Sequence, residues 1–306
     1  MVSPDNNQTV IDVFRFYDEY DFLQARLAFI RQEFAGKQFN IRSIAYIPSV
    51  SNSGVINLID LDKLHALQLE YDFFRFHVFH IPESWTKSSS RSSEDYSFDY
   101  ISDNLRQYLN SNPDSILSFS DLDEVYDTSL LLMASIQLEA YDVSFSKMMS
   151  HYFRFDIVFK EHWPGTVFLR YSSLAVHSLG TLKYSAHHAL NKNNTIYGGH
   201  HLSYFQSSYN SKRVNSHFVN GFAYRFLLAS LGINPALRLI RFSSGKKNIP
   251  INIRENFSSL QSNYPFDNIT WLRAIVVYLK FDIFILLFIS FVRFIRNRAL
   301  LLGILK

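Results

Sequence analysis

Three carboxylates within four residues, Asp121-Leu122-Asp123-Glu124, are the strongest chemical signal in the sequence. They follow a short apolar segment, residues 116–120, which is predicted to be a buried strand. Alternate residues of an extended segment project to the same side, so Asp121 and Asp123 can converge on one ion. Carboxylates at a strand end suit a hard cation such as Mg²⁺ or Mn²⁺, which also takes phosphate oxygens. The alternative interpretation is that these carboxylates cap a helix that follows them.

Histidines form the second group with chemical potential. Eight of the eleven lie between residues 151 and 217, among them the pairs His187-His188 and His200-His201. An imidazole can bind a metal or pass a proton to a substrate, although a single histidine is more often an ordinary surface or core group. Gly198-Gly199 precedes the second pair, and paired glycines let a backbone approach a ligand closely.

Several chemistries are excluded by what the sequence lacks. It has no cysteine, so disulfides, thiolate metal sites and cysteine nucleophiles are ruled out. It also has no Gly-x-Gly pair, no phosphate-binding Gly-x-x-x-x-Gly-Lys loop and no Gly-x-Ser-x-Gly elbow. The net charge of +3, from 30 basic and 27 acidic side chains, is too even to suggest a nucleic-acid partner. With 47% apolar residues, the 306-residue chain can bury a substantial core.

The elements that must position these groups follow from apolar spacing. Residues 10–14 are predicted to be a strand, and residues 43–47 a second one. Between them, apolar residues recur at helical spacing from Leu23 to Phe34, and Gly36 is placed to end that helix. A strand–helix–strand opening predicts an α/β domain with parallel pairing. Further strands are expected at 73–81 and 167–170, a helix at 100–109, and a serine-rich loop at 84–97.

Three segments resemble the motifs of glycosyltransferase family 17, which includes the β-1,4-mannosyl-glycoprotein 4-β-N-acetylglucosaminyltransferases. The family opens with a strand bearing an Asp, followed by Phe-x-x-Glu-x-Asp-x-Leu-x-x-Arg-Leu. The matching residues here are Asp12, Phe16, Glu19, Asp21, Leu23, Arg26 and Leu27. The family's Asp-x-Asp-Glu is matched at 121–124, and its later Gly-Gly-Trp-His-x-Ser resembles residues 198–203. Trp163 and Gly165 also match, whereas His200 stands where the family has Trp, and Val125-Tyr126 where it has Ile-Pro.

The resemblance implies a GT-A-like fold, in which a Rossmann-like α/β sheet flanked by helices binds a nucleotide sugar. It implies that Asp121 and Asp123 hold Mn²⁺ or Mg²⁺, with His201 as a third ligand or a phosphate contact. Asp12, Glu19, Arg26 and Gly199 would contact the donor. The implied reaction is inverting transfer of N-acetylglucosamine from UDP-N-acetylglucosamine to a glycan or lipid-linked acceptor, with Glu124 or Asp123 as the base.

Two other functions are compatible with the same residues. The departures at positions 125, 126 and 200 also fit an inactive, membrane-associated carbohydrate-binding protein of the same fold. A metal-dependent phosphotransferase could use the same carboxylates but would release a different product. Slow hydrolysis of a nucleotide sugar would separate a transferase from a lectin.

The chain is expected to divide into a catalytic domain at 1–258 and a helical segment at 259–306 that associates with a membrane. Residues 283–292 are apolar except for Ser290, and arginines follow at 293, 296 and 298. Residues 275–295 include Lys280 and Asp282, so an interfacial or re-entrant helix is favoured over a spanning one, with a buried C-terminal helix as the alternative. Since no secretory signal opens the sequence, the expected location is the cytoplasmic face of a membrane, in a bacterial or viral enzyme.

Overall fold

The computed structural model describes residues 8–50, 56–86, 93–108, 113–152, 154–159, 162–188, 193–203, 240–242 and 249–261. The strands are β1 Gln8–Arg15, β2 Phe39–Pro48, β3 Phe74–Phe79, β4 Ile116–Asp121, β5 Glu124–Val125, β6 Val143–Tyr152, β7 Arg154–Phe159, β8 Trp163–Arg170, β9 Thr195–Ser203 and β10 Ile240–Phe242. The α-helices are α1 Tyr20–Phe34, α2 Leu61–Glu70, α3 Glu83–Thr86, α4 Ser93–Arg106, α5 Thr128–Gln137, α6 Leu179–His188 and α9 Ile251–Phe257, and the 3₁₀ helices are η2 Tyr171–Ala175 and η6 Ser258–Leu260.

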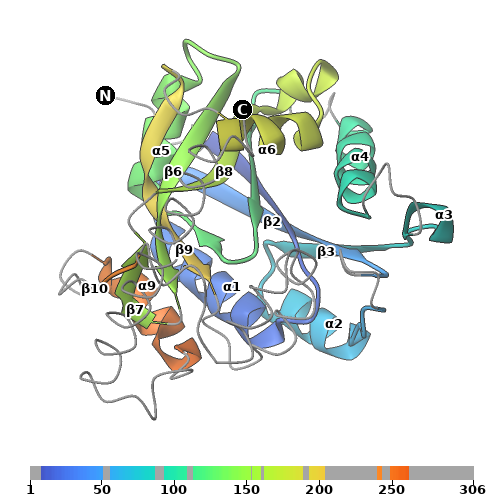
Figure 1. Ribbon diagram of the computed structural model, residues 1–306, viewed down its shortest axis with the longest axis horizontal. Helices are drawn as coiled ribbons and strands as arrows, with labels where there is room; N and C mark the ends of the chain where they lie inside the picture. The colour runs from blue at the N-terminus through green and yellow to red at the C-terminus, as the bar shows by residue number, and fades with distance from the viewer. Residues whose placement is uncertain are drawn as a thin grey trace, which may run out of the picture. The chain divides into compact units, whose positions relative to one another are not determined.

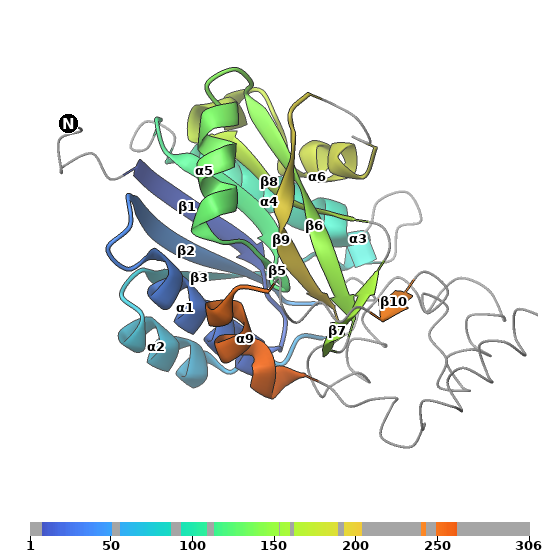
Figure 2. The same ribbon diagram turned by 90° about the vertical axis from the view of Figure 1, so that its left-hand side faces the viewer.

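One mixed sheet organises these elements (Figures 1 and 2). Its first half is parallel, in the order β3-β2-β1-β4, as the strand–helix–strand opening predicted. Beyond β4 lie the antiparallel strands β8, β6, β7 and β10. The strand β9 runs parallel to β6 and antiparallel to the two-residue β5. The site described below lies where the parallel half meets β5 and β9.

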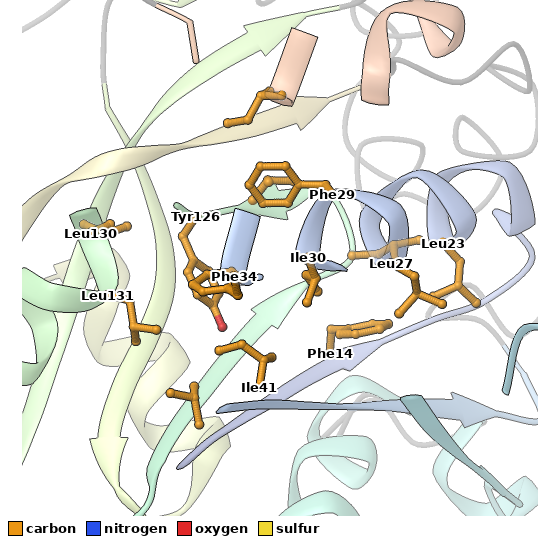
Figure 3. Packing of buried hydrophobic residues seen from close by; sticks show 14 of the residues in the cluster. Phe14, Leu23, Leu27, Phe29, Ile30, Phe34, Ile41, Tyr126, Leu130 and Leu131 are labelled. Atoms are coloured by element: carbon orange, nitrogen blue, oxygen red, sulfur yellow. The ribbon is translucent and has the colours of Figure 1, made fainter. Parts of the chain in front are cut away.

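Helices cover both faces of the parallel strands, so β1 is buried on both sides from Val10 onward. Val10 and Phe14 point to the face covered by α1, where Figure 3 shows the packing around Phe14. Ile11 and Val13 point to the opposite face and pack in a second cluster with residues of α4 and α6. A strand buried on both sides loses the alternation of apolar and polar residues that a half-exposed strand shows. The predicted Rossmann-like α/β architecture is therefore confirmed.

The helix α1 forms as its spacing predicted, and its apolar stripe is buried against the sheet. Leu23, Leu27, Ile30 and Phe34 all lie on this stripe (Figure 3). The helix ends at Phe34, and Gly36 follows in the left-handed region with a φ of 67°. Behind α1, Phe257 of α9 packs on Phe22 and Phe29, with ring centroids 5.1 and 6.1 Å apart.

The serine-rich segment departs from the predicted loop. Residues 83–86 form α3, and α4 begins at Ser93 and contains most of the helix predicted at 100–109. Serine is tolerated there because its hydroxyl can bond within the helix: Ser97 Oγ donates to the carbonyl of Ser93 and Ser102 Oγ to that of Phe98. Burial of Phe98 and Ile101 against the sheet then supplies the stabilisation that local sequence did not indicate.

The predicted membrane segment at 259–306 lies outside the described residues, apart from positions 259–261. Within the described ranges, no helix combines the length and apolar character that crossing a bilayer requires.

Candidate active site

The acidic segment is a turn between two strands, at the carboxyl end of the parallel sheet. Asp121 is the last residue of β4, and Glu124 is the first of β5. The next helix, α5, begins only at Thr128, and its N-cap is Asp127, whose side chain accepts a hydrogen bond from the Leu130 amide at 2.9 Å. The helix-cap interpretation of residues 121–124 is therefore wrong, because Asp127 makes the cap.

A buried arginine holds this turn from the α1 face of the sheet. Arg26 is 2% exposed, and its Nη1 donates to three backbone carbonyls of the turn. The shortest of these bonds, 2.6 Å, goes to Glu124 O, and those to Leu122 O and Asp121 O measure 3.0 and 3.3 Å. Its Nη2 donates to Ser120 Oγ and to the carboxylate of Asp12. A guanidinium presents several donors in one plane, so one side chain can fix a whole turn.

Asp12 completes this buried network. Its carboxylate is 0% exposed and accepts hydrogen bonds from Arg26 and from the hydroxyls of Ser43, Ser118 and Tyr126. The sequence predicted Asp12 and Arg26 as donor contacts. In the structure both lie inside the fold, and these bonds to the chain itself fix the position of the turn.

The opposite face of the same strands carries a second set of charges. Ser120 faces α1, so the next residue, Asp121, faces α4 and α6. Arg15, the Cα partner of Asp121 across β1 and β4, donates to Asp121 Oδ1 at 2.8 Å and lies 2.8 Å from Glu94 Oε1. Burial alone would raise the pKa of Asp121, but Lys183 and Arg15 outweigh it and hold that pKa well below its usual range.

Glu124 is the most tightly bound carboxylate of the turn. It is 0% exposed and accepts from Lys183 Nζ at both oxygens (2.8 and 2.9 Å), from Trp163 Nε1 (2.9 Å) and from the Asp121 amide (3.2 Å). Burial raises its pKa, and Lys183 acts against that shift. These four bonds fix Glu124 in place.

Asp123 and His201 face each other at the same turn. His201 Nε2 lies 3.5 Å from Asp123 Oδ2, and His201 Nδ1 lies 3.2 Å from Ser150 Oγ. The His201 ring stacks on Trp163, with centroids 4.3 Å apart and an interplanar angle of 14°. Trp163 thus touches His201 with its face and Glu124 with its indole N–H.

The fit of this group to a divalent cation is partial. Two ligands of one Mn²⁺ or Mg²⁺ ion lie about 3 Å apart when each is about 2.1 Å from the metal, so Asp123 and His201 fit as a pair. Asp121 is turned toward Arg15 and Lys183. Across the described part of the chain, no three carboxylate or imidazole side chains are gathered tightly enough to hold a metal.

A second histidine pair lies beside this group, one residue before His201. His151 Nδ1 is 3.1 Å from the carbonyl oxygen of Phe155, and its Nε2 is 3.0 Å from Nδ1 of His200. A carbonyl oxygen can only accept, so Nδ1 of His151 donates to it and Nε2 accepts from His200. Burial, strengthened by the neighbouring His200, lowers the pKa of His151 to about 3, and burial lowers that of His200 to about 4.

The remaining predicted residues have structural surroundings of their own. Gly199 has a φ of 77°, and a Cβ there would lie 2.9 Å from Met148 Cε and 3.0 Å from Val125 O. It therefore lets β9 approach β5, and the space beside it is filled by protein. Glu19 immediately precedes α1, where its carbonyl accepts from the Leu23 amide at 2.9 Å. The pair at 187–188 closes α6, with side chains outside the described part.

Two site residues, Arg15 and Lys183, carried no motif signal. For Arg15 the available clue was a charged residue directly after the predicted strand at 10–14, in which Asp12 is the one polar residue. Lys183 lies in an unremarkable helical segment, and only the packing of α6 brings it to the turn.

Three comparisons with known proteins were made, and one of them found similar chains. No protein-family model matches the sequence, and no curated protein matches it significantly. Among solved structures, the chain is similar to the galactosyltransferase LgtC in complex with donor and acceptor sugar analogues, at 10% identity over 62% of this chain and 72% of that one, with a TM-score of 0.34. It is also similar to 4-diphosphocytidyl-2C-methyl-D-erythritol synthase (8% identity, 74% and 97% covered, TM-score 0.37) and to the bifunctional glycosyltransferase WbbM in its apo form (14%, 87% and 52%, TM-score 0.36). TM-scores this low leave the function to be inferred from the site itself.

Proposed function

We propose that this chain is a glycosyltransferase that moves a sugar from a nucleotide-sugar donor to a glycan or lipid-linked acceptor. The observation that carries the proposal is the convergence of three motifs that lie far apart in the sequence. Arg26 of the first motif binds the carbonyl of Glu124 in the second. Glu124 pairs across β5 and β9 with His201 of the third motif.

The position of the site in the sheet supports the same proposal. Open α/β sheets bind ligands at the carboxyl ends of their strands, where neighbouring connections run to opposite faces. The chain leaves β1 through α1 on one face and enters β4 after α4 on the other. Arg15 and Asp121 are the last paired residues of these two strands, so the turn at 121–124 lies at this switch point.

We further propose that Asp123 and His201 hold Mn²⁺ or Mg²⁺, with Asp121 as a third ligand. When bound, such a cation neutralises the charge that develops on a departing nucleoside diphosphate. Asp123 offers an oxygen and His201 a nitrogen at a compatible separation, and Trp163 keeps the imidazole in its plane. The rigid turn, fixed by Arg26, holds these groups in place before the donor binds.

Of the two carboxylates predicted as the base, Asp123 is the better placed. Its side chain is 13% exposed, whereas Glu124 is buried and already accepts four hydrogen bonds. We assign Glu124 to positioning Lys183 and Trp163. Asp123 would then bind the cation through Oδ2, beside His201, and accept the proton of the acceptor hydroxyl at Oδ1.

The proposed donor sugar and stereochemistry are taken from the sequence resemblance, and the proposed location from the sequence after residue 280. The motifs at 16–27, 121–124 and 198–203 favour UDP-N-acetylglucosamine as the donor and inversion at the anomeric carbon. The apolar segment and arginines after residue 280 favour a location at the cytoplasmic face of a membrane.

Release of UDP from UDP-N-acetylglucosamine, with and without acceptor, tests the proposal. Asp123→Asn should reduce the rate at least about 100-fold while the circular dichroism spectrum is unchanged. Asp127→Asn is the matched control, since Asn also serves as an N-cap and activity should be retained. Absence of any hydrolysis by the unmodified protein, together with retained sugar binding, would favour the carbohydrate-binding alternative.

A further inference from the structure

Lys183 is a buried cation beside the acidic turn at 121–124. No sequence motif indicated this residue. It lies on α6, which packs against α4 on the face of the sheet opposite Arg26, and it is 5% exposed. Its Nζ donates to both carboxylate oxygens of Glu124, at 2.8 and 2.9 Å. The same nitrogen is 3.5 Å from Asp121 Oδ2. The ammonium group therefore lies between two carboxylates of one turn.

The two contacts of Lys183 differ in strength. Those to Glu124 are charge-assisted hydrogen bonds at close range, whereas the 3.5 Å separation from Asp121 is an ion pair without a short bond. Two short bonds from one nitrogen to both oxygens of a buried carboxylate are those of a charged ammonium group. Glu124 thus anchors the ammonium group, and Asp121 Oδ2 is held only loosely.

Asp121 is also the more accessible of the two carboxylates. It is 29% exposed, and its other oxygen is bound by Arg15 at 2.8 Å. Oδ2 is consequently the oxygen that Asp121 can offer to an added cation, and Lys183 already lies beside it. Two cations that share one carboxylate oxygen repel each other, more strongly in a partly buried site than in water.

We infer that Lys183, which Glu124 anchors, competes with a divalent cation for Asp121 Oδ2. The competition keeps cation affinity low until a nucleoside diphosphate adds negative charge of its own. This inference rests on the proposed function for its ligand, but it concerns cation binding and can be tested without transfer.

The test is a titration of the full chain with Mn²⁺, followed by electron paramagnetic resonance of the free ion, with and without UDP. Lys183→Met should bind Mn²⁺ about tenfold or more tightly than the unmodified chain when UDP is absent, and UDP should add less to its affinity. Lys183→Arg, which keeps the charge, should bind like the unmodified chain. Glu124→Gln should bind more weakly, because the released ammonium group can then pair fully with Asp121.

The double variant Lys183→Met/Glu124→Gln covers the case in which an unpaired Glu124 prevents folding or takes up a proton. It replaces the buried ion pair by neutral groups of similar size and should also bind Mn²⁺ more tightly than the unmodified chain. Lys37→Met removes an exposed lysine that follows α1, and its affinity should not change.

Equal or weaker Mn²⁺ binding by both Lys183→Met and Lys183→Met/Glu124→Gln would overturn the inference and leave Lys183 a purely structural residue. Tighter binding by Lys37→Met to the same extent would also overturn it, because the effect would then be one of net charge. The proposed function fails independently: absence of UDP release from every nucleotide sugar would reject it, whatever the order of Mn²⁺ affinities.

Discussion

The guanidinium of Arg26 lies 2.6 Å from the carbonyl oxygen of Glu124, although 98 residues separate the two in sequence. This contact ties the first helix to the acidic turn and explains how one buried side chain can determine the shape of a site that it does not line. The same guanidinium binds Asp12, so the turn, the helix and the central strand are joined at one point.

Replacing Arg26 by Met should be among the most damaging changes in the chain. The carboxylate of Asp12 would lose its ionic partner in a fully buried position, which costs about 3–5 kcal/mol. Urea unfolding measures the loss. Arg31→Met is the control from the same helix, because Arg31 and Glu70 are about half exposed and 3.8 Å apart, and a change below about 1 kcal/mol is expected. Similar losses in the two variants would show that the buried network contributes little.

The pairing of Trp163 with Glu124 gives a second prediction. Trp163→Phe keeps an aromatic ring against His201 but removes the N–H that binds Glu124 Oε1 at 2.9 Å. A hydrogen bond to a buried charged group is worth about 2 kcal/mol, and a loss of that size is expected in urea unfolding. A loss below about 0.5 kcal/mol in Trp163→Phe would contradict the bonding described for Glu124.

Much of the parallel half of the sheet could be predicted from the sequence, because local apolar spacing determines it. The strand at 10–14, the helix ending at Phe34 and the strand at 116–120 all follow from which residues must be buried. The antiparallel half was harder to predict from the sequence. The strands β6 and β9 are far apart along the chain and pair with a shift in register, and β9 contains two glycines and two histidines. Nothing local predicts that Ser150 will contact His201, 51 residues away.

The sequence predicted only those residues of the site that belong to a local motif. Asp121, Asp123, Glu124 and His201 have types and positions that indicate chemistry, and the structure brings them together. Asp12 and Arg26 have the same kind of signal but lie beneath the turn, because strand parity turns Asp12 toward α1. Lys183 has no signal in its own segment, and its role follows only from the packing of α6.

The buried histidine pair should make the fold sensitive to mild acid. In the folded chain the pKa values of His151 and His200 are lowered to about 3 and about 4, whereas unfolded histidine titrates near 6.5. Between these values the unfolded state binds more protons, so stability is complete above about pH 6.5 and falls as the pH decreases toward 4. At pH 5 each histidine should reduce the free energy of unfolding by about 2 kcal/mol relative to pH 7.5.

Urea unfolding at pH 7.5 and pH 5.0, in the presence of EDTA, measures this difference. His200→Gln should remove a large part of it, because the residue that replaces it does not titrate. His65→Gln replaces an exposed histidine of α2 and should leave the difference unchanged. A pH dependence that survives unaltered in His200→Gln would show that other groups cause it.

Substitutions at two glycines with positive φ distinguish the cost of backbone strain from the cost of overpacking. Gly36 has a φ of 67° and nothing within 4 Å of a Cβ, so Gly36→Ala should cost only the strain of the left-handed region, about 1 kcal/mol. Gly199 has a φ of 77°, and its Cβ would meet both Met148 and the carbonyl oxygen of Val125. Strain and overpacking together predict a loss of about 3 kcal/mol for Gly199→Ala in urea unfolding. Gly199→Ala should also weaken Mn²⁺ binding, because displacing β9 from β5 moves His201 relative to Asp123. Gly36→Ala should bind Mn²⁺ normally.

Equal losses of stability in Gly36→Ala and Gly199→Ala, with Mn²⁺ affinity unchanged in both, would contradict this prediction. The approach of β9 to β5 would then not determine the geometry of the site.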